Sequence, residues 1–192
     1  MLSENLIQDF IRYSEKRNWK YDSYTTECTI QFRLTRFFDY LYNDLFSIEL
    51  ESNIHRYGIT EKLQKKEIDI DILNTSSKQK NAIELKYIRD LGSYDIGFYN
   101  TCVDIKFLEQ LKGFGYKECD CLILTNIQQV YSSREKNRAS ELRKNLYDCF
   151  QKKFCISGKI YRKENHEINF DKKYPIKWFD FTDSIKACII QV

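Results

Sequence analysis

Two short segments of alternating apolar and polar residues, separated by a turn, restrict the fold more than any other feature of this sequence. The first, KKEIDIDIL (residues 65–73), places Ile68, Ile70 and Ile72 on one face and acidic residues on the other. The second, AIELKYI (residues 82–88), alternates in the same way after the turn-like stretch NTSSKQKN. Because side chains of a strand point alternately to its two faces, these segments predict two neighbouring antiparallel strands.

The register of this strand pair decides which acidic residues meet. Pairing Leu73 with Ala82 across the turn places Asp71 directly opposite Glu84. Two adjacent carboxylates repel each other unless a cation or a proton relieves the repulsion. A site made only of oxygen ligands suits Mg²⁺, with Mn²⁺ as a substitute. We therefore expect Asp71 and Glu84 to be metal ligands.

Two further charged residues lie on the same face. Lys86 follows Glu84 by two residues and is placed to hold a phosphate oxygen or an attacking water beside the ion. In the same register Asp69 faces Lys86, and we expect it to orient that lysine. The resulting group of ionisable side chains suits hydrolysis of a phosphodiester bond. An acid-rich alternating strand is also typical of a solvated sheet face.

The segments around this pair predict further helices and strands. Helical spacing of apolar residues predicts helices over residues 2–17, 25–45, 101–114 and 138–153, the second capped by Thr25 or Thr26. Strands are predicted over residues 46–51 and 119–126 and in the segments FCISGKIYR, HEINF and IKWFDF. Because the 192 residues show no repeat and no linker, we expect a single α/β domain over residues 1–192.

The pattern D-x(12)-E-L-K, formed by Asp71 and by Glu84 to Lys86 behind a helix, resembles the PD-(D/E)XK nuclease superfamily, which has the restriction endonuclease-like fold. Members of that family are mostly Mg²⁺-dependent enzymes that cut DNA. The resemblance covers a core of about residues 25–126. It implies a central mixed β-sheet flanked by helices, with Asp71 and Glu84 as metal carboxylates and Lys86 as the catalytic lysine.

The resemblance implies functions for two residues outside the strand pair. Many members supply a catalytic glutamate from the first core helix, and Glu27 is the matching position, one turn before Gln31. Gln110 matches a glutamine that lies near DNA in some members. The chain also departs from the family pattern, because Ile70 stands where the family name has proline and Asp69 is a competing carboxylate.

Positive charge is concentrated in residues 134–163, which contain ten basic and three acidic residues, although the formal net charge of the whole chain is only +3. A DNA phosphate backbone is attracted to such a region. We therefore expect Arg138, Arg143 and Lys144 to contact nucleic acid. A solvated helix face has the same pattern, and the sequence leaves both interpretations open.

Composition excludes other classes of protein. The longest uninterrupted apolar runs have four residues, against the ~20 of a membrane span, and the first helix carries Glu4 and Asp9 where a signal peptide is apolar or basic. We expect a cytoplasmic protein with no membrane association. Seven cysteines form an odd number without the spacing of a zinc site, so no disulfide framework is expected.

The function predicted from these features is a Mg²⁺-dependent endonuclease that hydrolyses DNA, in restriction or another form of host defence. The alternative is a catalytically inactive nucleic-acid-binding or assembly subunit with the same fold. The sequence does not separate DNA from RNA or branched substrates. Because cutting both strands of a duplex needs two active sites and one domain supplies one, a homodimer is also expected.

Overall fold

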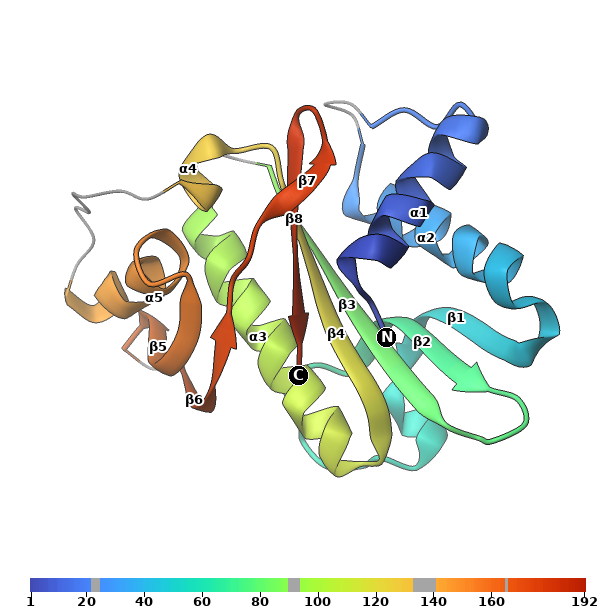
Figure 1. The fold of residues 1–192 in the computed structure, drawn as a ribbon. Coiled ribbons are helices and arrows are strands. Elements are labelled where there is room, and N and C mark those ends of the chain that lie inside the picture. The colour runs from blue at the N-terminus through green and yellow to red at the C-terminus, as the bar shows by residue number, and fades with distance from the viewer. Residues whose placement is uncertain (22–24, 90–93, 133–140, 165) are drawn as a thin grey trace.

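A computed structural model of the chain describes residues 1–21, 25–89, 94–132, 141–164 and 166–192, with the backbone alone at residues 94 and 141–143. Its centre is a six-stranded sheet in the order β1-β2-β3-β4-β8-β7 (Figure 1). The strands are β1 (Phe46–Asn53), β2 (Glu67–Asn74), β3 (Lys80–Ile88), β4 (Tyr116–Thr125), β7 (Phe179–Thr182) and β8 (Ile185–Gln191). Only β3 and β4 are parallel and the other neighbours are antiparallel, so the sheet is mixed. The α/β class with a mixed sheet flanked by helices is confirmed.

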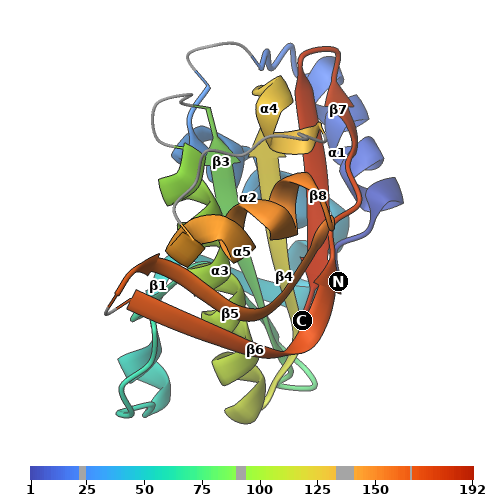
Figure 2. The same ribbon diagram turned by 90° about the vertical axis from the view of Figure 1, so that its left-hand side faces the viewer.

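Helices cover both faces of this sheet. On one face lie α1 (Glu4–Lys16) and α2 (Glu27–Tyr42), and on the other lies α3 (Tyr94–Gly113), which connects the parallel strands β3 and β4. As Figure 2 shows, a two-stranded sheet and α5 lie on the outer side of α3. The remaining elements are α4 (Gln128–Tyr131), α5 (Glu141–Gln151), β5 (Cys155–Lys163), β6 (His166–Pro175) and the short 3₁₀ helices η1 (Asn43–Leu45) and η2 (Ile54–Tyr57).

The alternation of strand β3 divides the core into two layers. Ile83, Leu85 and Tyr87 belong to the hydrophobic cluster under α1 and α2, whereas Ala82 and Ile88 belong to the cluster under α3. Residues two apart in a strand share a face. The even-numbered charged residues of β3 therefore face α3, inside the protein, and are not on a solvated surface.

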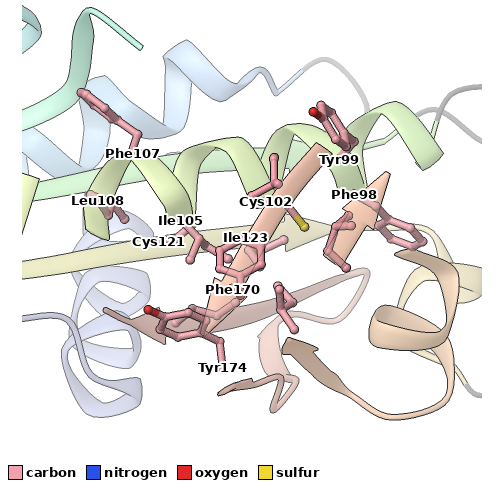
Figure 3. Close-up of a cluster of buried hydrophobic side chains, with 14 of the residues drawn as sticks. Phe98, Tyr99, Cys102, Ile105, Phe107, Leu108, Cys121, Ile123, Phe170 and Tyr174 are labelled. Carbon is pink, nitrogen blue, oxygen red and sulfur yellow. The ribbon is translucent and has the colours of Figure 1, made fainter. Parts of the chain in front are cut away.

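Helix α3 is apolar on more than one side, because it lies between the central sheet and the β5–β6 sheet. Figure 3 shows side chains from α3, β4 and β6 meeting in one buried cluster. Phe98 of α3 stacks on Phe150 of α5 with ring centroids 4.2 Å apart. A helix buried on two sides lacks a single apolar stripe. For this reason the sequence pattern identified only its second half, and the helix begins seven residues before the predicted residue 101.

Local sequence explains the start of α2, whereas the last strand of the chain was not predicted. Of the two predicted caps, Thr25 and Thr26, it is Thr26 that caps the helix, and its Oγ1 accepts a hydrogen bond from the backbone N–H of Thr29 at 3.2 Å. Strand β8 was not predicted, although it pairs with both β4 and β7.

Among the described residues, no helix has the length and apolar character that a membrane span requires. All seven cysteines are free thiols.

The predicted register of the β2–β3 hairpin is wrong by two residues. Asp71 lies opposite Ala82, and Leu73 lies opposite Lys80. The cause is a short turn: Asn74 N donates to Gln79 O, and the side chain of Asn74 accepts two backbone hydrogen bonds within the turn. Six residues separate the paired Leu73 and Lys80, where the prediction placed eight residues between Leu73 and Ala82.

Candidate active site

A group of carboxylates and lysines lies where strands β2 and β3 face helix α3. Asp69 comes from β2, Glu84 and Lys86 come from β3, and Asp104 comes from the middle of α3. Their side chains are largely buried, with exposed fractions of 14% for Asp69, 0% for Glu84 and 4% for Asp104. We call Asp69, Glu84 and Asp104 the carboxylate cluster.

Two backbone hydrogen bonds fix Asp69 and Glu84 against each other. The N–H of Asp69 donates to Oε1 of Glu84 at 3.3 Å, and the N–H of Leu85 donates to Oδ2 of Asp69 at 2.8 Å. Each carboxylate is thus held by the backbone of the neighbouring strand. Asp69, and not Asp71, is the residue that lies beside Glu84.

Asp104 adds a third carboxylate that the sequence analysis did not single out. Its Oδ1 lies 3.2 Å from Lys65 Nζ, and its Oδ2 lies 3.5 Å from Lys86 Nζ. Oδ2 is nevertheless buried without a hydrogen-bond partner. A buried polar atom without a hydrogen bond is uncommon in folded proteins and indicates a place where a further polar group or ion can bind.

Lys65, from the loop between η2 and β2, contacts every member of the carboxylate cluster. Its Nζ lies 3.4 Å from Asp69 Oδ1 and 3.2 Å from Asp104 Oδ1, and it also forms an ion pair with Glu84 Oε2. Within the described residues, no three His, Cys, Asp or Glu side chains are already arranged to hold a metal ion. The ammonium group of Lys65 is the cation at the centre of the cluster.

The charges of the site do not balance. With Glu27 included, four carboxylates accompany two ammonium groups. Burial, together with the negative charges of Asp69 and Asp104, raises the pKa of Glu84 well above its ordinary value. Burial also raises the pKa of Asp104, against the opposing effect of the lysines. Both shifts are caused first by burial and are increased by the neighbouring acids.

Lys86 is held from two sides by acidic residues. Its Nζ lies 3.1 Å from Glu27 Oε1 and 3.5 Å from Asp104 Oδ2. Burial opposes protonation of Lys86, but the charges of Asp104 and Glu27 outweigh it and raise the pKa of the ammonium group. Glu27 also accepts a hydrogen bond from the backbone N–H of Tyr87 at 2.8 Å. The structure therefore brings the predicted helix residue Glu27 to the predicted lysine.

Gln31, one turn after Glu27, fastens helix α2 to the strand that carries Asp69. Its Nε2 donates to Oε1 of Glu51 at 2.9 Å and also to the backbone carbonyl of Asp69. Glu51 has a left-handed φ of 50°, which is uncommon inside a strand. Strands β1 and β2 pair on both sides of this point. The backbone of β1 is therefore distorted at Glu51, close to the point where the carbonyl of Asp69 accepts a hydrogen bond from the side chain of Gln31.

Asp71 occupies a separate buried position. Its Oδ2 accepts hydrogen bonds from Ser52 Oγ at 3.1 Å and from the hydroxyl of Tyr57. Burial and the contact with Asp71 raise the pKa of Tyr57. The expected pair of Asp71 and Glu84 is therefore not formed, because the hairpin register moves Asp71 two residues along the ladder. For the same reason Asp69 lies beside Glu84 instead of opposite Lys86.

The predicted nucleic-acid contacts are only partly described. Gln110 lies on α3, and its Oε1 accepts a hydrogen bond from the backbone N–H of Gln64 at 2.9 Å, so it holds the loop that carries Lys65. Lys144 is exposed on α5. Arg138 lies outside the described residues, as does the side chain of Arg143. Contact of these residues with DNA remains a prediction.

A sequence signal for Asp104 exists, whereas none exists for Lys65. Asp104 lies in the same helical stripe as Leu108 and Leu111, and a carboxylate inside an apolar stripe indicates a buried charge with a partner. Lys65 is one of several lysines in a polar loop.

Comparison of the chain with protein-family models, with curated proteins and with solved structures finds no match.

Proposed function

We propose that this protein is a Mg²⁺-dependent endonuclease that hydrolyses phosphodiester bonds in DNA. The observation that carries the proposal is the placement of Asp69 beside Glu84 on adjacent strands, with Lys86 two residues further on the same face. Two close carboxylates with a nearby ammonium group match the requirements of metal-assisted phosphodiester hydrolysis. A lysine that only formed ion pairs with surface acids would not require two close carboxylates on adjacent strands beside it.

The order of elements around the site supports a resemblance to the PD-(D/E)XK nucleases. Helix α2, strands β1 to β3, helix α3 and strand β4 follow one another in the chain, and β3 and β4 are parallel. In that comparison Asp69 replaces Asp71 as the first metal carboxylate. Glu84 remains the second carboxylate, Lys86 the lysine and Glu27 the helix glutamate.

The residues present fit a divalent cation. Asp69, Glu84 and Asp104 supply only oxygen atoms, which Mg²⁺ and Mn²⁺ prefer. Asp104 Oδ2 is buried and lacks a hydrogen bond, and the site as a whole has an excess of two carboxylates over ammonium groups. A divalent ion would lower that excess of negative charge. We propose that these three carboxylates hold it.

The other residues of the site would act on the substrate. When bound, Mg²⁺ supplies positive charge that stabilises a phosphate oxygen and increases the acidity of water. Lys86, fixed between Glu27 and Asp104, is placed to pair with a phosphate oxygen or to orient the attacking water. Glu27 positions Lys86 and keeps it protonated. Backbone N–H groups hold the carboxylates of Asp69, Glu84 and Glu27 in place.

The proposed substrate and assembly follow from charge and from the number of sites. The basic stretch that includes Lys144 would attract a phosphate backbone. Cutting both strands of a duplex requires two such sites, and we propose that a homodimer or a transient pair on DNA provides them.

The proposal is tested by incubating supercoiled plasmid with the protein in Mg²⁺, in Mn²⁺ and in EDTA, with single-stranded DNA and RNA in parallel. We expect metal-dependent nicking or cutting that Glu84→Gln and Lys86→Met abolish. Glu67→Gln is the matched control, because Glu67 is an exposed acid at the start of the neighbouring strand β2. Absence of cleavage on all three substrates would reject the nuclease.

One observation favours a second candidate, a catalytically inactive nucleic-acid-binding subunit. Lys65 already contacts all three carboxylates of the cluster, so the fold has a cation of its own there. In such a subunit Lys86→Met would leave salt-dependent DNA binding unchanged, with no cleavage to lose. Cleavage by the wild-type protein that this substitution removes would exclude the inactive subunit.

A further inference from the structure

We propose that the ammonium group of Lys65 and a divalent cation bind the carboxylate cluster in exchange for each other. In the metal-free protein Lys65 neutralises the cluster, and binding of the metal ion moves the Lys65 side chain out toward solvent. This inference rests on the metal site of the proposed function. It gives a role to Lys65, which has none in the proposed nuclease mechanism.

The contacts of Lys65 place it where an ion would bind. Its Nζ is within ion-pair distance of Asp69, Glu84 and Asp104 at once. Like charges repel strongly at a separation of a few ångströms in a partly buried site. An ammonium group and a metal ion therefore cannot share the centre of the cluster. Asp104 Oδ2, buried and without a hydrogen bond, is a further oxygen that an ammonium group bound through Oδ1 leaves unused.

The side chain of Lys65 reaches solvent, unlike the two most deeply buried carboxylates that it contacts. Its side chain is 25% exposed, whereas the side chains of Glu84 and Asp104 are 0% and 4% exposed. It has a flexible four-carbon stem and lies in a loop, not in a strand. An outward rotation of this side chain needs no movement of the sheet.

The backbone on either side of Lys65 is anchored. Gln64 N donates to the side chain of Gln110 at 2.9 Å, and Ile54 N donates to the carbonyl of Lys66 at 2.9 Å. Displacement therefore involves the side chain of Lys65 and leaves the loop in place. Lys86 differs, because its ammonium group is also held at 3.1 Å by Glu27, a residue outside the cluster. The exchange is specific to Lys65.

The first test measures metal binding directly. Titration calorimetry with Mn²⁺ compares the wild-type protein with Lys65→Met and with Lys62→Met, an exposed lysine of the same loop. Removing the competing ammonium group should tighten Mn²⁺ binding by at least about tenfold in Lys65→Met, since a competitor lowers apparent affinity by the fraction of sites it occupies. Lys62→Met should bind like the wild type. Equal or weaker binding by a folded Lys65→Met variant would overturn the proposal.

The second test uses the wild-type protein, because Lys65→Met leaves three buried carboxylates without their cation and could fail to fold. Brief acetylation of lysines followed by mass spectrometry measures how accessible each ammonium group is. Labelling of Lys65 relative to Lys62 should rise severalfold when Mn²⁺ replaces EDTA. An unchanged ratio at a Mn²⁺ concentration shown by calorimetry to saturate the site, or absence of Mn²⁺ binding, would overturn the exchange.

These measurements separate the exchange from the nuclease activity. Tighter binding in Lys65→Met without cleavage of any substrate would support the exchange and reject the nuclease. Cleavage by a protein whose Mn²⁺ affinity does not respond to Lys65→Met would support the nuclease and reject the exchange.

Discussion

The backbone N–H of Asp69 donates a hydrogen bond across 3.3 Å to the carboxylate of Glu84. The bond joins the two strands at the point where they face helix α3, and it orients the glutamate toward the aspartate. Since the neighbouring N–H of Leu85 holds Asp69 in return, the two acids are positioned as a unit. This pairing makes Asp69, and not Asp71, the aspartate of β2 that we expect to bind the metal ion.

Asp69→Asn should reduce metal-dependent cleavage by at least about 100-fold, because it removes the charge of a proposed metal ligand beside Glu84. Losing a metal ligand is expected to cost more activity than losing a residue that only orients one. Asp71→Asn should retain most activity, since Asp71 bonds to Ser52 and Tyr57 in a separate buried position. Initial rates of plasmid nicking measure both. An inactive Asp71→Asn protein that is folded, together with an active Asp69→Asn protein, would contradict the observed register.

Glu27→Gln should lower the cleavage rate by about 10–100-fold while leaving the melting temperature nearly unchanged. The amide keeps a hydrogen-bond acceptor for the N–H of Tyr87 but loses the charge that holds Lys86. Asp39→Asn, on an exposed turn of the same helix, is the control and should behave as the wild type. Equal rates for all three proteins would show that Lys86 needs no positioning by Glu27.

The stability of the metal-free protein should fall as pH rises from the ordinary carboxyl value of 4.5 through the raised pKa of Glu84. Burial and the charges of Asp69 and Asp104 raise that pKa, so the folded protein binds the proton more tightly than the unfolded chain does. The free energy of unfolding therefore decreases over this interval.

Melting temperatures in EDTA between pH 4 and pH 8 measure this effect, and Glu84→Gln, which cannot ionise, should remove part of the decline. Saturating Mg²⁺ should raise the melting temperature of the wild type more at high pH than at low pH, because the ion competes with the proton for Glu84. A wild-type curve that is parallel to that of Glu84→Gln would contradict the raised pKa.

Phe150→Ala should destabilise the protein by about 3–5 kcal/mol, the usual cost of removing a buried phenylalanine. The ring is fully buried and stacks on Phe98, so its loss loosens α5 from α3. Urea unfolding measures the change. Phe32→Ala is the control, since Phe32 is 54% exposed, and should stay within about 0.5 kcal/mol of the wild type. A small effect of Phe150→Ala would show that α5 contributes little to the core.

Local sequence was enough to predict part of the candidate site. Alternation placed Glu84 and Lys86 on one face, and helix capping placed the start of α2 at Thr25 or Thr26, next to Glu27. These features depend on a few neighbouring residues. The structure then brings Glu27 to Lys86 through the packing of α2 on the sheet.

The hairpin register and the partners of Asp104 and Lys65 depend on geometry that residue patterns do not encode, although the helical stripe of Asp104 indicates its burial. The hairpin register depends on a turn stabilised by the side chain of Asn74 and by Lys78, which has a left-handed φ of 58°. A lysine is an unexpected residue at such a position. Asp104 joins the site only because α3 crosses behind β3, and Lys65 joins it from a loop. Both are tertiary contacts over long sequence separations.

Within the carboxylate cluster, the most deeply buried acids lie behind lysines that reach solvent. The side chains of Glu84 and Asp104 are 0% and 4% exposed, whereas those of Lys86 and Lys65 are 18% and 25% exposed, and Glu27 beside Lys86 is 39% exposed. A polyanion that approaches the site therefore meets both ammonium groups before it meets Glu84 and Asp104. Losing either lysine would slow that approach even where it leaves the bound geometry intact.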